Sequence, residues 1–225
     1  MNKINKFSIF LFIVATTMLF SSCKKDYIKS KATFWPDIKI NGSSTVVITE
    51  GDESFTDPGA VVTVNGNPIS FDTDNNVDYT TPGVYSITYS AANEDGITAS
   101  QTRVVIVVPV SAVSIPDFTG DFTLTTPSRP SPVPTMEVSS LGSNVYYSSN
   151  IYGSNGSNTV LTFPAYFYTT NGTNVTFLSG PYVENNNFCD GGTATWNPVT
   201  KRLACTFTMG HAAPGTIFSR TWTHN

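Results

Sequence analysis

The sequence at residues 81–90 is TPGVYSITYS, and this stretch decides the fold class of the chain. Tyr85, Ile87 and Tyr89 alternate with small hydroxyl-bearing residues, a period of two that predicts a β-strand with one buried face. Pro82 and Gly83 predict a turn immediately before that strand. Strand-like runs of this kind recur after residue 23 and no long helical period accompanies them, so we predict an all-β protein.

Working outward from this strand, the flanking sequence supplies the rest of a small β domain. Residues 46–48, 60–64 and 104–108 are rich in β-branched side chains, which favour strands. Asn65 and Gly66 predict a tight hairpin turn after the second of these runs. About seven short strands within residues 36–109 fit an immunoglobulin-like (Ig-like) β-sandwich.

Several motifs in this segment carry a family resemblance. The motifs EGD at 50–52, FTDPGA at 55–60, TPGVY at 81–85 and RVV at 103–105 keep a characteristic order and spacing. Together they resemble the Ig-like domain of pesticidal crystal proteins and many bacterial surface proteins. The resemblance implies a spacer or an adhesive stalk, and the fold alone implies no activity.

The second half of the chain predicts a different β domain at residues 117–225, after a linker at 110–116. Its clearest strand is 203–209, where Leu203, Cys205, Phe207 and Met209 alternate with polar or small residues. Further strands are predicted at 145–148, 160–163, 175–178, 193–196 and 217–223. Their order describes a meandering antiparallel sheet, which we expect to form a barrel or a sandwich.

This second domain also carries a resemblance, on the opening FTGDF at 118–122, the VYYSSNIYG run at 145–153 and the WNPVT hairpin at 196–200. These motifs resemble the C-terminal β domain of uncharacterised gut-bacterial lipoproteins that also carry an N-terminal Ig-like domain. The resemblance implies an architecture and lends no activity.

The first residues predict export. Residues 1–22 have a basic start, an apolar run at 7–20 and small residues before Cys23, as in a secretory signal peptide. The stretch LFSSC at 19–23 resembles a bacterial lipobox, which implies that Cys23 is acylated and that 23–35 is a tether; an ordinary cleaved signal with an incidental cysteine is the alternative. The KKD motif at 24–26 resembles the export signal of surface lipoproteins. We therefore expect a membrane-anchored protein of the outer membrane, on its extracellular face, with attachment facing the periplasm left open.

The charge of the chain excludes nucleic acid as a partner, and its uneven distribution distinguishes the two halves of the chain. All 16 acidic residues follow Cys23, so the exported chain has a net charge of about −6, and its predicted β domains carry no patch of basic residues, which excludes nucleic-acid binding. Ten acids lie between residues 33 and 109, whereas 16 of the 28 aromatic residues follow residue 110. This change in composition supports two domains.

The sequence predicts no catalytic site, metal site or cofactor. His211 and His224 are the only histidines, and no hydrolase or metalloprotease motif is present. The acids at 72, 74 and 78 (Asp72, Asp74 and Asp78) raise a calcium hypothesis, but their spacing is not that of an EF-hand and a solvated acidic loop is the alternative.

Cys189 and Cys205 are candidates for a disulfide in an exported protein. The hairpin opposes this pairing, because a register with Trp196 opposite Leu203 places Cys189 opposite Gly210, roughly 17 Å along the strand from Cys205. Only a bend at the DGG motif of residues 190–192 would bring Cys189 back towards Cys205. A disulfide and two free thiols therefore both stay open as alternatives.

The aromatic residues suggest a ligand. Exposed rings stack on sugars, and the candidates are Trp196, Trp222, Tyr146, Tyr147 and Tyr152, with Trp196 expected to project from the turn that follows it. Aromatic residues also fill the core of any sheet, which is the competing interpretation. We therefore predict a non-enzymatic binding module whose partner is a glycan or another envelope protein. The alternatives are a structural or assembly component of an envelope complex, or an enzyme of unfamiliar type.

Overall fold

A computed structural model describes the protein at residues 32–110, 115–125, 133–153, 163–179, 189–210 and 215–225. The signal segment, Cys23 and His211 lie outside these ranges, as do most of the linker and the run predicted at 160–162. Every regular element in the described part is a strand, which confirms the all-β prediction. Within the same residues, no helix has the length and apolar character needed to cross a bilayer.

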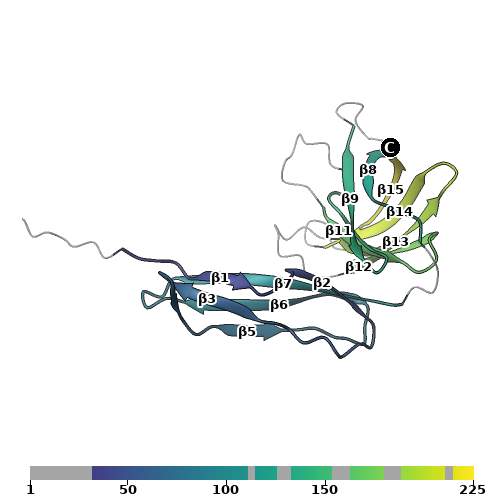
Figure 1. The fold of residues 1–225 in the computed structure, drawn as a ribbon. Helices are drawn as coiled ribbons and strands as arrows, with labels where there is room; N and C mark the ends of the chain where they lie inside the picture. The colour runs from purple at the N-terminus through teal and green to yellow at the C-terminus, as the bar shows by residue number, and fades with distance from the viewer. Residues whose placement is uncertain (1–31, 111–114, 126–132, 154–162, 180–188, 211–214) are drawn as a thin grey trace, which may run out of the picture. The chain divides into compact units, whose positions relative to one another are not determined.

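The first seven strands form two sheets (Figure 1). One sheet has the order β1-β3-β4, and the other has the order β2-β7-β6-β5. The strands are β1 (Asp37–Ile40), β2 (Thr45–Thr49), β3 (Ala60–Val64), β4 (Asn67–Pro68), β5 (Asp72–Asn75), β6 (Gly83–Ala92) and β7 (Thr98–Val108). All pairs are antiparallel except β2 with β7, which run parallel.

Both sheets contribute to one core, so this part of the chain is the predicted Ig-like sandwich. Ile38 and Val62 come from the first sheet, and Ile87, Tyr89 and Val105 come from the second. The period of two predicted for β6 is confirmed at Ile87 and Tyr89, which are fully buried.

The predicted hairpin turn is also confirmed. Asn65 and Gly66 have φ angles of 50° and 78° and join β3 to β4. Asn tolerates and Gly favours this left-handed region, so these two residues can form the turn without strain.

A buried ion pair holds the two sheets together. The Arg103 side chain is 1% exposed, and its Nε lies 2.9 Å from Oδ1 of Asp57, which is 20% exposed. The guanidinium also donates to the carbonyls of Asn41 and Ser43, which flank the connection from β1 to β2. Tyr89 donates its hydroxyl to the same Asp57 carboxylate at 2.7 Å. One charged group from β7 therefore contacts segments that belong to both sheets.

The second half is a closed eight-stranded antiparallel barrel in which each strand pairs with its neighbours in sequence and β15 pairs with β8 (Figure 1). The strands are β8 (Gly120–Leu124), β9 (Thr135–Gly142), β10 (Val145–Ser148), β11 (Ala165–Thr169), β12 (Asn174–Ser179), β13 (Cys189–Asn197), β14 (Arg202–Met209) and β15 (Ile217–His224). The predicted meander is thus a barrel and not a sandwich. Closure pairs every strand on both sides and leaves no open sheet edge.

Side chains occupy the interior of the barrel. The four apolar residues predicted to share one face of β14 all point inward and are buried. Aromatic rings pack against each other in the interior, with centroids 5.6 Å apart for Phe167 and Phe177 on adjacent strands and 5.2 Å apart for Phe118 and Trp196. An interior packed in this way is a hydrophobic core and not a ligand channel.

Candidate functional site

Three of the five rings predicted to stack on a sugar lie in the barrel core. Trp222 is fully buried, Tyr146 is 5% exposed and Trp196 is 7% exposed. The prediction that Trp196 projects from its turn is wrong, because Trp196 pairs with inward-facing Leu203 and residues directly opposite in a ladder share a face. Among the described residues, the Trp196 indole Nε1 is the buried side-chain polar atom without a hydrogen-bond partner. These three rings cannot receive a sugar without unfolding the barrel.

The other two predicted rings are half-buried. Tyr147 packs against Tyr166, with ring centroids 5.4 Å apart. Tyr152 lies under the Arg220 guanidinium, whose central carbon is 4.7 Å from the ring centroid, and Arg220 Nε also donates to the Tyr152 carbonyl at 2.8 Å. The cation covers one face of Tyr152, and Tyr166 packs against Tyr147, so each ring already has a partner within the barrel.

The two cysteines considered for a disulfide are free thiols buried in the barrel core. A register shift between Cys189 and Gly192 places Cys189 opposite Met209 instead of Gly210. The shift brings Cys189 onto the inward face but leaves it about 13 Å along the strand from Cys205, still beyond the ~7 Å Cα separation that a disulfide spans. Burial raises the pKa of the Cys189 thiol to about 12, and it also raises the pKa of Cys205.

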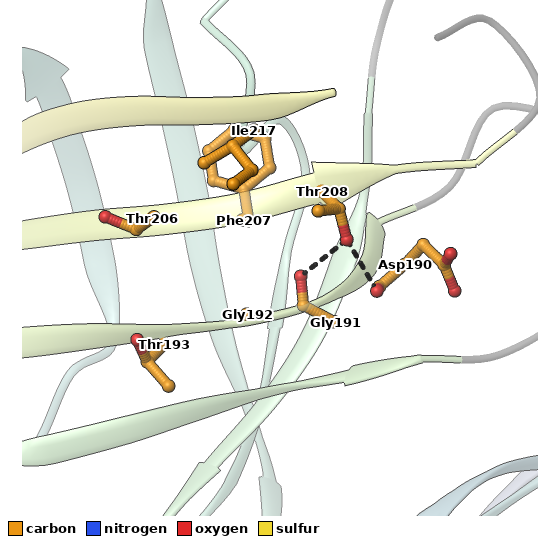
Figure 2. A pocket seen from close by; sticks show the side chains of 8 residues that line it. All are labelled: Asp190, Gly191, Gly192, Thr193, Thr206, Phe207, Thr208 and Ile217. Atoms are coloured by element: carbon orange, nitrogen blue, oxygen red, sulfur yellow. Dashed lines mark hydrogen bonds between the residues drawn. The ribbon is translucent and has the colours of Figure 1, made fainter. Parts of the chain in front are cut away.

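That register shift creates a depression on the outer wall of the barrel, which we call the Gly-Gly groove. Its lining consists of Asp190, Gly191, Gly192, Thr193, Thr206, Phe207, Thr208 and Ile217, and its volume is about 340 Å³ (Figure 2). Gly192 has a φ of 150°, and a Cβ there would lie 2.6 Å from Phe207 Cα. Only glycine permits this close approach of β13 to β14.

Polar groups surround a floor of bare backbone in the Gly-Gly groove. Thr208 donates its hydroxyl to the Asp190 carbonyl at 2.7 Å and lies 3.5 Å from the Gly191 carbonyl, as the dashed lines in Figure 2 mark. The Asp190 carboxylate accepts a 2.5 Å hydrogen bond from the Ser179 hydroxyl. Thr193 and Thr206 are exposed at the rim, and Ile217 is an apolar side chain that is 68% exposed. The accessible lining of the groove is mostly apolar, and its hydroxyls and carboxylate expose little polar surface to a ligand.

Sequence reasoning missed this site. The DGG motif at 190–192 was noted only for its effect on Cys189, although two consecutive glycines within a strand also signal a bulge or a close backbone approach. Thr206 and Thr208 belong to the polar side of β14, which the alternation of that strand marked as outward-facing.

The other candidate residues do not gather into a site. Asp72 and Asp74 are exposed on β5, while Asp78 accepts hydrogen bonds from the Thr80 backbone and hydroxyl. His224 contacts the Thr119 carbonyl at 2.9 Å and packs against Phe122. Within the described residues, no three His, Cys, Asp or Glu side chains are grouped so that they could hold a metal ion.

Comparison with known proteins places the sandwich among surface modules. Residues 38–107 match the family described as bacterial surface protein, Ig-like domain, and the resemblance to the pesticidal-crystal type stays a prediction. A search of curated proteins found no match. The crystal structure of the lipoprotein BT2262 from Bacteroides thetaiotaomicron is 22% identical, covers 85% of this chain and 100% of its own, and has a TM-score of 0.42. That likeness is too weak to carry an argument about function.

Proposed function

We propose that the chain is a non-enzymatic, lipid-anchored protein of the outer membrane whose barrel binds carbohydrate on the cell surface at the Gly-Gly groove. The observation that carries this proposal is the groove itself, a mostly apolar surface over the glycine backbone with threonine hydroxyls and the Asp190 carboxylate beside it. Sugars present hydroxyl groups that both donate and accept hydrogen bonds, and these groups on the protein can satisfy both roles.

Two further observations support the cellular location and the membrane attachment in this proposal. The Ig-like match is to a domain of bacterial surface proteins, not to an enzyme family, and supports a cell-envelope or surface location. The lipobox resemblance at 19–23 supports membrane attachment through Cys23. The sandwich then acts as the spacer between the anchor and the barrel.

A glycan array tests the carbohydrate proposal. The protein is the full exported chain from residue 23, carrying Cys23→Ser so that it stays soluble without an acyl chain. We expect binding to a defined set of glycans, and Thr193→Val should weaken it because a rim hydroxyl is lost while the side-chain volume is kept.

The matched control is Thr195→Val, on the same strand and also exposed but outside the groove. It should bind as the parent chain does. Equal loss in both variants, or no binding to any glycan, would count against the groove as a carbohydrate site.

A structural or assembly component of an envelope complex is the second candidate, and the burial of Trp196, Trp222 and Tyr146 favours it. These rings stabilise the barrel and are not available to stack on a sugar. Crosslinking in intact cells separates the two proposals. A stable envelope partner together with a silent array supports the structural role.

A further inference from the structure

Two consecutive aromatic side chains are exposed just before β1. Trp35 is 68% exposed and Phe34 is 45% exposed, whereas the other two tryptophans, Trp196 and Trp222, are buried. Isolated exposed aliphatic residues are ordinary on protein surfaces. Two adjacent aromatic rings at the start of a domain present a larger apolar surface, and burying that surface against a binding partner or a membrane would be favourable.

The backbone beneath these rings is fixed to the sandwich. Asn93 donates its side-chain amide to the Phe34 carbonyl at 2.8 Å, and its carbonyl oxygen accepts from the backbone N–H groups of Asp95 and Ile97. Pro36, directly after Trp35, is buried. The rings are therefore held out from a rigid base, and little conformational entropy is lost when they bind a surface.

The sequence before the rings identifies the surface. Only ten residues separate Cys23 from Phe34, and among them are Lys24, Lys25, Lys29 and Lys31 but a single acid, Asp26. A fully extended tether of this length reaches about 40 Å at most. Lysines next to a membrane attract anionic lipid headgroups, and tryptophan prefers the boundary between headgroups and acyl chains.

We propose that Phe34 and Trp35 insert at the headgroup boundary of an anionic phospholipid bilayer, as a second membrane contact of the sandwich beside the acyl chains on Cys23. The inference rests on the lipid anchor of the proposed function, because a short tether makes this contact intramolecular and raises its effective concentration above that of the unanchored chain. The contact holds the base of the sandwich at the bilayer instead of leaving it free on its tether.

Tryptophan fluorescence tests this contact in the full exported chain carrying Cys23→Ser, mixed with vesicles of phosphatidylglycerol and phosphatidylethanolamine. Trp196 and Trp222 are in the barrel core, so a vesicle-dependent change reports on Trp35. We expect a shift of emission to shorter wavelength, protection from acrylamide and quenching by lipids brominated on the acyl chains. Trp35→Ala should abolish these changes and reduce co-sedimentation with vesicles at least about fivefold.

The matched control is Val199→Ala, which removes another exposed apolar side chain, 90% exposed, in the turn between β13 and β14. It should co-sediment as the parent chain does. Equal acrylamide quenching with and without vesicles, or a Trp35→Ala chain that sediments like the parent, overturns the proposal. Equal binding to phosphatidylcholine vesicles overturns the claim that the contact requires anionic lipid.

A separate measurement distinguishes this inference from the anchor on which it rests. Cells expressing the native chain are supplied with a labelled fatty acid. Absence of label on the protein overturns the anchor alone, whereas a silent vesicle experiment with the Cys23→Ser chain overturns the second contact alone.

Discussion

The ion pair between Arg103 and Asp57 leads to a sharp prediction about the stability of the sandwich. Asp57→Ala removes the counter-ion of a guanidinium that is 1% exposed. Breaking a buried ion pair from one side typically costs 3–5 kcal/mol, because the remaining charge stays buried without compensation. Arg103 keeps its carbonyl acceptors at Asn41 and Ser43, and Asp57 is itself one-fifth exposed, so we expect the lower end, about 3 kcal/mol.

Hydrogen exchange measured by mass spectrometry on the full exported chain resolves this effect by region. A loss of about 3 kcal/mol makes the amides of β6 and β7 exchange on the order of a hundredfold faster. Peptides from the barrel serve as an internal reference and should not change. Asp72→Ala, which removes an exposed acid from β5 of the same sandwich, is the matched control and should leave exchange as it is.

A double variant completes the test. Asp57→Ala combined with Arg103→Met should be no less stable than Arg103→Met alone, because the carboxylate has no charge to neutralise once the cation is gone. Acceleration of less than about tenfold in β6 and β7 for Asp57→Ala, or an equal effect of Asp72→Ala, would refute the reasoning from the buried charge.

Three further predictions follow from other features. Cys23→Ala should release the protein from the membrane fraction of cells, because the lipobox resemblance makes that thiol the acylation point; a variant that still pellets with membranes contradicts it. Limited proteolysis near residues 110–116 should release fragments of about 75 and about 110 residues, whereas one protected core across the linker counts against two separately folding units. Burial raises the pKa of Cys189 from 9.0 to about 12, so the unfolded chain loses its proton first and the stability present below pH 9 is lost as the pH rises towards 12. The urea midpoint should fall over that interval, and Cys189→Ala combined with Cys205→Ala should flatten the fall; an unchanged slope contradicts the assignment.

Local signals were sufficient for most of the fold. The alternation at Tyr85, Ile87 and Tyr89 predicted β6, the pair Asn65 and Gly66 predicted the turn between β3 and β4, and the alternation from 203 to 209 predicted β14. Strands β9 and β11 were missed. In β11 four of the five residues are buried, so no alternation marks it, whereas β9 alternates from Thr135 to Ser139 and could have been predicted.

The candidate site was harder to predict because a period of two separates the faces of a strand but does not say which face is inside. Trp196 is the instructive case. Its register opposite Leu203 was already implied by the hairpin, and applying the rule that opposed residues share a face would have placed it in the core. The Gly-Gly groove depends on a shift of register between two strands; the glycines at 191 and 192 signal a bulge but do not say which groups of the neighbouring strand it exposes.

The parallel pairing of β2 with β7 has a mechanical consequence for the membrane attachment proposed above. Five residue pairs, from Thr45 with Val104 to Thr49 with Val108, join these two strands. The chain enters β2 from the side of the tether and leaves β7 towards the linker, so tension along the chain pulls the two strands in opposite directions along their length. The load is then shared by all hydrogen bonds of the ladder at once, and single-molecule pulling from the two ends of the sandwich would measure its resistance as a high unfolding force. A module with this strand pairing resists fluid drag because the whole ladder between β2 and β7 must be sheared at once. It does not open one hydrogen bond at a time.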